Sequence, residues 1–83
     1  MSDTEARARD AAQMLENPLY RETIDTLRKE SIDAWVATKS DQDAERDRLW
    51  TMVKMLDRMD AYFQTIVAEG RFAANRAVRQ PLP

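Results

Sequence analysis

The stretch from Leu49 to Ile66, LWTMVKMLDRMDAYFQTI, decides the fold of this chain. Its apolar residues recur at alternating steps of three and four, which places them on one side of an α-helix. A helix with such a stripe is stable in water only when the stripe is buried against another helix. The residues that we predict to mediate self-association are Leu49, Met52, Val53, Leu56, Met59, Phe63 and Ile66. The stretch therefore predicts an all-α protein that packs helix against helix.

The helix that contains this stretch is predicted to begin near Ser40 and to continue to about Glu69. Ser40 is a good N-cap, and the acids that follow it, such as Asp41 and Asp43, interact favourably with the positive end of the helix dipole. Gly70 is the only glycine and suits a left-handed C-cap. The helix would have about 28 residues and be roughly 40 Å long.

Residues 1–16 are predicted to form a short N-terminal helix. Ser2 and Glu5 have the spacing of a capping box, and the alanines that follow favour helix. Asn17-Pro18 then interrupts the chain, because proline restricts the residue before it but fits the first turn of a new helix. A second helix should therefore begin near Pro18 with Asn17 as its cap.

The second helix and the long helix are predicted to form an antiparallel helical hairpin over residues 17–70. The connection near residues 38–40 is short, which favours antiparallel packing of the two helices. The residues on the apolar face of the second helix are Tyr20, Ile24, Leu27, Ala34 and Trp35, with Ser31 as a polar residue among them. This face would cover part of the apolar stripe of the long helix.

The apolar stripe of the long helix is wider than one partner helix can cover. Val53 and Val67 widen it on one side, Met55 and Tyr62 widen it on the other, and Trp50 points elsewhere. We therefore predict a homo-oligomer, with folding of the short terminal helices over the same surface as the alternative. The flexible thioethers of this stripe suit either a core or self-association, or else binding of a foreign ligand.

Two polar residues interrupt the apolar faces. Asp60 follows Met59 directly, and Ser31 lies within the stripe of the second helix. An acid in this position can pair with an arginine across an interface and fix the register of the helices. The alternative for both residues is an exposed edge.

Residues 71–83 form a predicted basic C-terminal tail, since Arg71, Arg76 and Arg79 follow all fifteen acids of the chain. These arginines with Phe72 are candidates for contact with a partner or a nucleic acid, because arginine binds phosphate and an aromatic ring stacks on a base. The alternative is a solvated helix end, where cations are favourable. A short helix here would be stopped by Pro81.

Composition excludes most catalytic chemistry. The 83 residues contain no cysteine and no histidine, which removes disulfides, thiolate zinc sites and the commonest general base. The acids between Asp41 and Asp47 lack the glycine and the distal glutamate of a calcium loop. We predict no catalytic residue, no metal site and no cofactor, and hence no enzyme. We also expect no membrane segment and a location in the cytoplasm.

Four blocks of the sequence resemble small helical proteins encoded by tailed bacteriophages and prophages. They are Asn17-Pro18-Leu19, Trp35, the run from Asp43 to Trp50 (DAERDRLW) and the run from Ile66 to Arg71 (IVAEGR). The family is mostly of unassigned function and comes from gene modules for packaging and particle assembly. The resemblance covers about residues 10–75 and transfers no functional residue. It implies a bacterial host cytoplasm or a virion as the location, and a phage structural protein as a partner.

These observations together predict a non-enzymatic oligomeric assembly or adaptor protein, related to phage particles or DNA packaging. A phage small terminase subunit is a specific version, but it would carry a helix-turn-helix ahead of the hairpin, for which this chain has little room. The alternative is a small helical regulator that binds a host protein or a nucleic acid.

Overall fold

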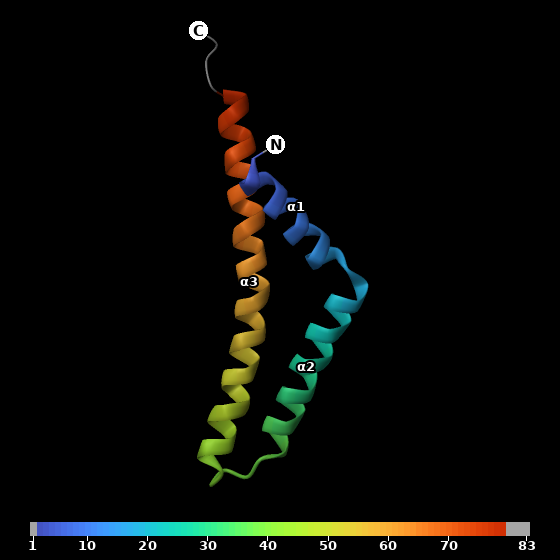
Figure 1. Ribbon diagram of the computed structural model, residues 1–83. Helices are drawn as coiled ribbons and strands as arrows, with labels where there is room; N and C mark the ends of the chain where they lie inside the picture. Colours follow the sequence, from blue (N-terminus) through green and yellow to red (C-terminus); the bar gives the residue numbers. More distant parts are fainter. Residues whose placement is uncertain (1, 80–83) are drawn as a thin grey trace.

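The computed structural model describes the backbone of residues 2–79 and the side chains of residues 2–76. This part of the chain contains three α-helices and no strand, which confirms the all-α prediction (Figure 1). The helices are α1 (Asp3–Glu16), α2 (Pro18–Ala37) and α3 (Asp43–Arg79). Pro81, which we predicted to stop a helix, lies outside the described residues.

The first two helices begin where their caps predict. The Ser2 side chain accepts a hydrogen bond from the backbone N–H of Glu5 and caps α1. The Asn17 side chain accepts from the N–H groups of Leu19 and Tyr20, and Pro18 is the first residue of α2. These bonds satisfy N–H groups that have no partner within the first helical turn.

The start of α3 corrects the prediction of a cap at Ser40. The helix begins at Asp43, and Ser40 lies in the preceding turn. Two hydrogen bonds between Lys39 and Gln42 close this turn. The Lys39 backbone N–H donates to the Gln42 side chain, and the Gln42 backbone N–H donates to the Lys39 carbonyl. The Gln42 carbonyl then accepts the first helical hydrogen bond from Arg46. The turn is therefore ordered by glutamine and not by serine.

The end of α3 corrects the prediction of a left-handed C-cap at Gly70. The helix continues to Arg79, and no glycine of the described chain has a positive φ. Gly70 is buried where α1 crosses α3, and a Cβ atom built on it would overlap the Cβ atom of Ala8. The glycine thus allows close approach of two helices, and residues 71–79 continue α3 without a break.

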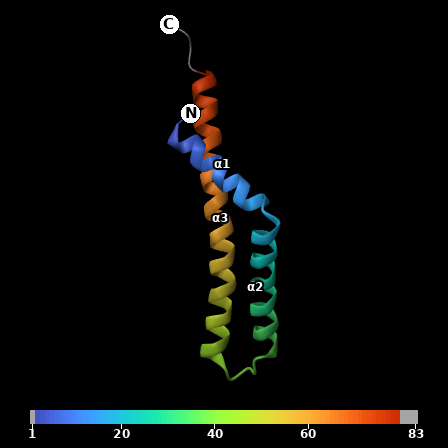
Figure 2. The ribbon, with the colours of Figure 1, turned by 45° about the vertical axis from the view of Figure 1, so that its right-hand side comes forward.

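The three helices form a long and thin molecule of 68 × 24 × 15 Å. α2 lies beside the N-terminal half of α3 and runs in the opposite direction, while α1 crosses the C-terminal half of α3 (Figures 1 and 2). The buried apolar residues are Ala11, Ile24, Leu49, Val53, Leu56 and Ile66. Ser31 is also buried, at 5% exposure, so the predicted alternative of an exposed edge is wrong for this residue.

Candidate interaction surface

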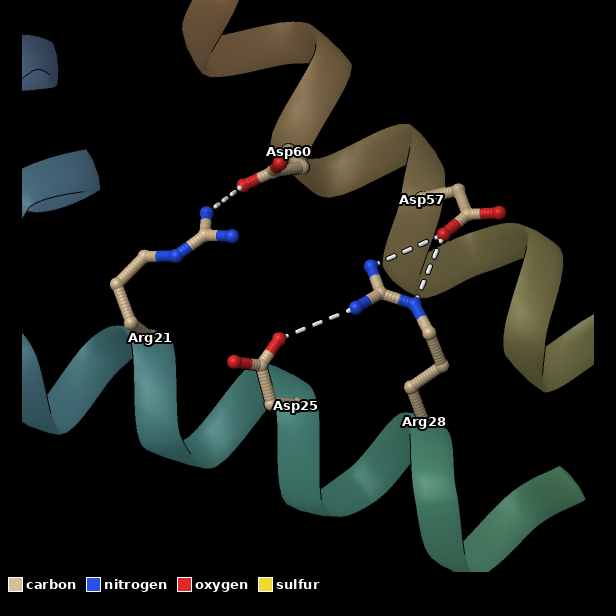
Figure 3. Close-up of polar contacts among 5 residues, drawn as sticks. All are labelled: Arg21, Asp25, Arg28, Asp57 and Asp60. Carbon is tan, nitrogen blue, oxygen red and sulfur yellow. Dashed lines mark hydrogen bonds and ion pairs between the residues drawn. The ribbon is translucent and has the colours of Figure 1, made fainter.

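One side of the α2–α3 pair is closed by ion pairs (Figure 3). Arg21 of α2 lies 2.8 Å from Asp60 of α3, and Arg28 lies 3.0 Å from Asp57. Arg28 also lies 3.3 Å from Asp25 on its own helix. The arginine that pairs with Asp60 therefore comes from the same chain. These half-exposed pairs set the register of α2 on α3 more than they stabilise the fold.

The other side of the α2–α3 pair is apolar and open. Met59 precedes Asp60 by one residue and so lies about 100° away from it around α3. Two adjoining hollows of about 320 and 240 Å³ lie on this side and share Met55 and Met59. Met55 is 53% exposed and Tyr62 is 61% exposed. We call this surface the methionine groove, and its main residues are Leu27, Met52, Met55, Met59, Tyr62 and Phe63.

The residues predicted for self-association divide between the core and this groove. Leu49, Val53, Leu56 and Ile66 are buried within the chain itself. Met52 and Met59 remain exposed, at 41% and 46%, and Phe63 is half-buried. About half of the predicted seam therefore packs against α1 and α2, and the thioethers provide the part that no helix of the chain covers.

Phe63 connects the groove to the core through Tyr20. The two rings meet edge to face at 5.6 Å between centroids. The Tyr20 hydroxyl is buried and has no hydrogen-bond partner among the described residues. Burial of this hydroxyl, with the negative charge of Asp60 nearby, raises the pKa of Tyr20, and Arg21 opposes the shift.

A second aromatic surface lies at the turn between α2 and α3. The Arg46 guanidinium lies 4.0 Å from the centre of the Trp35 ring and donates a 3.0 Å hydrogen bond to the Thr38 hydroxyl. Lys54 covers the exposed Trp50 ring at 4.8 Å. Among the neighbouring basic residues of α3, Arg48 forms an intrahelical ion pair with Glu45 at 2.6 Å. Arg46 instead holds the turn.

The predicted basic contact residues do not form one patch. Arg71, Phe72 and Arg76 are all exposed, and Phe72 is 68% exposed. Phe72 and Arg76 are one helical turn apart and line a shallow hollow together with Thr4 and Glu69. Arg71 lies about 100° around the helix from Phe72. The side chain of Arg79 lies outside the described residues.

The described part of the chain offers neither a cluster of metal ligands nor a membrane-spanning helix. No group of three or more acidic side chains there could hold a metal ion. None of its helices combines the length and apolar character needed to cross a bilayer.

Comparisons with models of protein families, with curated protein sequences and with solved structures found no match to this chain.

The sequence missed two parts of the candidate surface. The helical period places Leu27 on the face of α2 that packs on the long helix, whereas in the structure Leu27 is 40% exposed and lines the groove. The sequence reading also missed the ion pairs of Arg21 with Asp60 and of Arg28 with Asp57, although the two arginines share one side of α2 and the two acids share one side of α3. That charge pattern could have oriented the groove, because it identifies the polar side of the helix pair.

Proposed function

We propose that this protein is a non-enzymatic assembly or adaptor protein that acts as a homo-oligomer. The observation that carries the proposal is the methionine groove, an open apolar surface on a molecule with few buried side chains. Contiguous exposed apolar side chains, unlike scattered ones, mark an interaction site in soluble proteins. The antiparallel hairpin of α2 and α3 is the unit that self-associates, and α1 braces the far end of α3.

The shape of the chain supports this function. Its radius of gyration is 18.5 Å, whereas a compact chain of this length has about 12 Å. No side chain among residues 2–76 is buried completely. Such a thin molecule buries too little apolar surface to be strongly stable alone, and association with other chains is the usual remedy.

The proposed setting is a phage particle or its packaging apparatus in a bacterial host. This part of the proposal rests on the sequence blocks described above, which resemble proteins of such gene modules. The non-enzymatic part rests on the lack of histidine and cysteine.

Self-association is tested by sedimentation equilibrium and light scattering of the purified protein over a wide concentration range. We expect a mass at least twice the 9.6 kDa of one chain in the micromolar range. A monomer at several hundred micromolar would reject the assembly function, since the groove would then remain uncovered at concentrations above those of most cellular proteins.

The second candidate is a small regulator that binds a nucleic acid or a host protein. The exposed Phe72 and Arg76 on one side of α3 favour it, because an aromatic ring and a guanidinium can stack on a base and hold a phosphate. Electrophoretic shift titrations at two salt concentrations test this candidate with the wild type and with Arg71, Arg76 and Arg79 changed to Gln. Binding should weaken steeply with salt and be lost in the variant. No shift at low salt would reject nucleic-acid binding.

A further inference from the structure

We infer that a second copy of this chain occupies the methionine groove, and that the two copies are related by a two-fold axis parallel to the helices. In this arrangement α3 of each copy packs against α2 of the other and the two hairpins form a four-helix bundle. The inference rests on the proposed self-association and specifies its surface and geometry.

The surface area of the chain points to an occupant of this size. One chain exposes 6692 Å², whereas a globular monomer of 9.6 kDa exposes about 5,100 Å². The excess is about 1,600 Å² per chain, and a stable protein interface needs only about 800 Å² from each partner. The chain therefore exposes more surface beyond that of a globular monomer than one side of a stable dimer needs to bury.

The shape of the groove suits another helix. Met52, Met55, Met59 and Tyr62 follow one another at steps of three and four along α3, and Leu27 of α2 forms the opposite wall. Unbranched thioethers adapt to the surface that packs on them. In a four-helix bundle the partner's groove supplies the same side chains, so that apolar surface meets apolar surface.

The charged residues beside the groove indicate the direction of the two-fold axis. Arg58 borders the groove on α3, next to Met55 and Tyr62. Glu30 is three residues beyond Leu27 on α2 and lies about 100° around the helix from the buried Ser31, which puts it on the outer side of Leu27. Neither forms an ion pair among residues 2–76, although both stand beside an apolar surface. Each copy thus has a basic margin on one helix and an acidic margin on the other.

A two-fold axis parallel to the helices brings these margins together. The pairs of Arg28 with Asp57 and of Arg21 with Asp60 show which residues of α2 and α3 lie at the same height. Counted from these pairs, Glu30 lies level with residues 51 to 55 of α3, which is about 5 to 10 Å from Arg58 along the molecule. Rotation about an axis parallel to the helices does not change the position of a residue along the helices. Arg58 of one copy therefore faces Glu30 of the partner subunit. Both side chains lean toward the N-terminus of their own helix, which shortens their separation.

The other two-fold arrangement is less favourable. An axis perpendicular to the helices would pack α3 against α3 of the partner in the opposite direction. With this axis at the middle of the groove, between Met55 and Met59, Arg58 would approach Arg58 of the partner subunit, and like charges at an interface are repulsive. The parallel axis is thus the one that the charges of this chain favour.

The groove is tested with Met55→Lys in the full-length protein, with Val36→Lys as the matched control. Both residues are exposed and apolar, but Val36 lies on α2 away from the groove. We expect Met55→Lys to raise the dimer dissociation constant in sedimentation equilibrium at least tenfold, and Val36→Lys to change it less than threefold. Circular dichroism should show unchanged helicity in both variants.

The axis is tested by exchanging the charges. Arg58→Glu and Glu30→Arg should each weaken the dimer several-fold, and the double variant should return to within about threefold of the wild type. A double variant that is no tighter than the single variants would overturn the arrangement. A wild-type oligomer that is unaffected by Met55→Lys would overturn the groove as the interface but leave the proposed function intact, whereas a monomeric wild type would reject both.

Discussion

At the scale of single residues, the structure separates side chains that hold the turns and caps from apolar side chains that remain exposed. Arg46 belongs to the first group, since it packs on Trp35 and bonds to Thr38 across the turn. Met55 belongs to the second group, because more than half of its surface is exposed. Tyr20 belongs to neither, since its ring packs on Phe63 while its hydroxyl is buried without a partner among the described residues.

We expect Tyr20→Phe to leave stability unchanged at neutral pH or to increase it by up to about 1 kcal/mol, because it removes a buried and unpaired hydroxyl. The raised pKa of Tyr20 adds a pH effect. The folded state then binds the phenolic proton more tightly than the unfolded state, so stability falls as the pH rises past the ordinary tyrosine value of 10.0.

Urea denaturation of the wild type and Tyr20→Phe at pH 7 and above pH 10 measures both effects. The variant should lose less stability than the wild type over this range. Equal losses would show that the phenol is as well solvated in the folded chain as in the unfolded one.

At the scale of the helices, the crossing of α1 over α3 depends on small side chains. Gly70 of α3 lies against Ala8 of α1, and Ala11 is buried in the same helix. A glycine inside a helix normally costs about 1 kcal/mol relative to alanine. Its presence in the middle of α3 is explained by the close approach that it allows, because the Ala8 Cβ atom is rigid and cannot turn away.

We expect Gly70→Ala to destabilise the protein by about 1–3 kcal/mol, although alanine is the better helix former. The new methyl group would push α1 off α3, so hydrogen exchange should show loss of protection for the backbone amides of α1. The double variant with Ala8→Gly makes room again and should restore that protection. A more stable Gly70→Ala protein would mean that the two helices do not approach closely at this point.

At the scale of the whole molecule, an extended chain with a thin core gains stability by association. The 68 Å length and the open methionine groove leave much apolar surface in water. A partner that binds only the folded chain adds its binding free energy to the stability of the fold. Folding and oligomerisation of this protein should therefore be coupled.

This coupling makes the thermal midpoint depend on protein concentration. For a dimer of chains of this size, we expect the midpoint to rise by about 4 °C for each tenfold increase in concentration. Circular dichroism melts from the low micromolar to the high micromolar range measure this slope. Met55→Lys should flatten it, and a wild-type midpoint that is constant with concentration would contradict coupled folding and association.

The helix ends that the sequence predicts correctly are those that local hydrogen bonds determine. Ser2, Asn17 and Pro18 act on groups within three residues, and the predicted boundaries at these positions are confirmed. The start of α3 was misplaced because Gln42 competes with Ser40 for the same turn, and residue preferences do not decide between two nearby caps.

The tertiary structure alone decides how each apolar and charged residue is used. The three-and-four spacing makes one side of α3 apolar, but only the packing of α1 and α2 buries Leu56 and leaves Met59 exposed. The same spacing predicts a continuous apolar stripe. In the structure, Asp60 lies at one edge of this stripe, and its ion pair with Arg21 directs that edge toward α2. A helical period determines which residues share a face, since it depends on neighbours along the chain. The residues that pack against this face come from a distant part of the sequence. The helical period does not predict which residues these are.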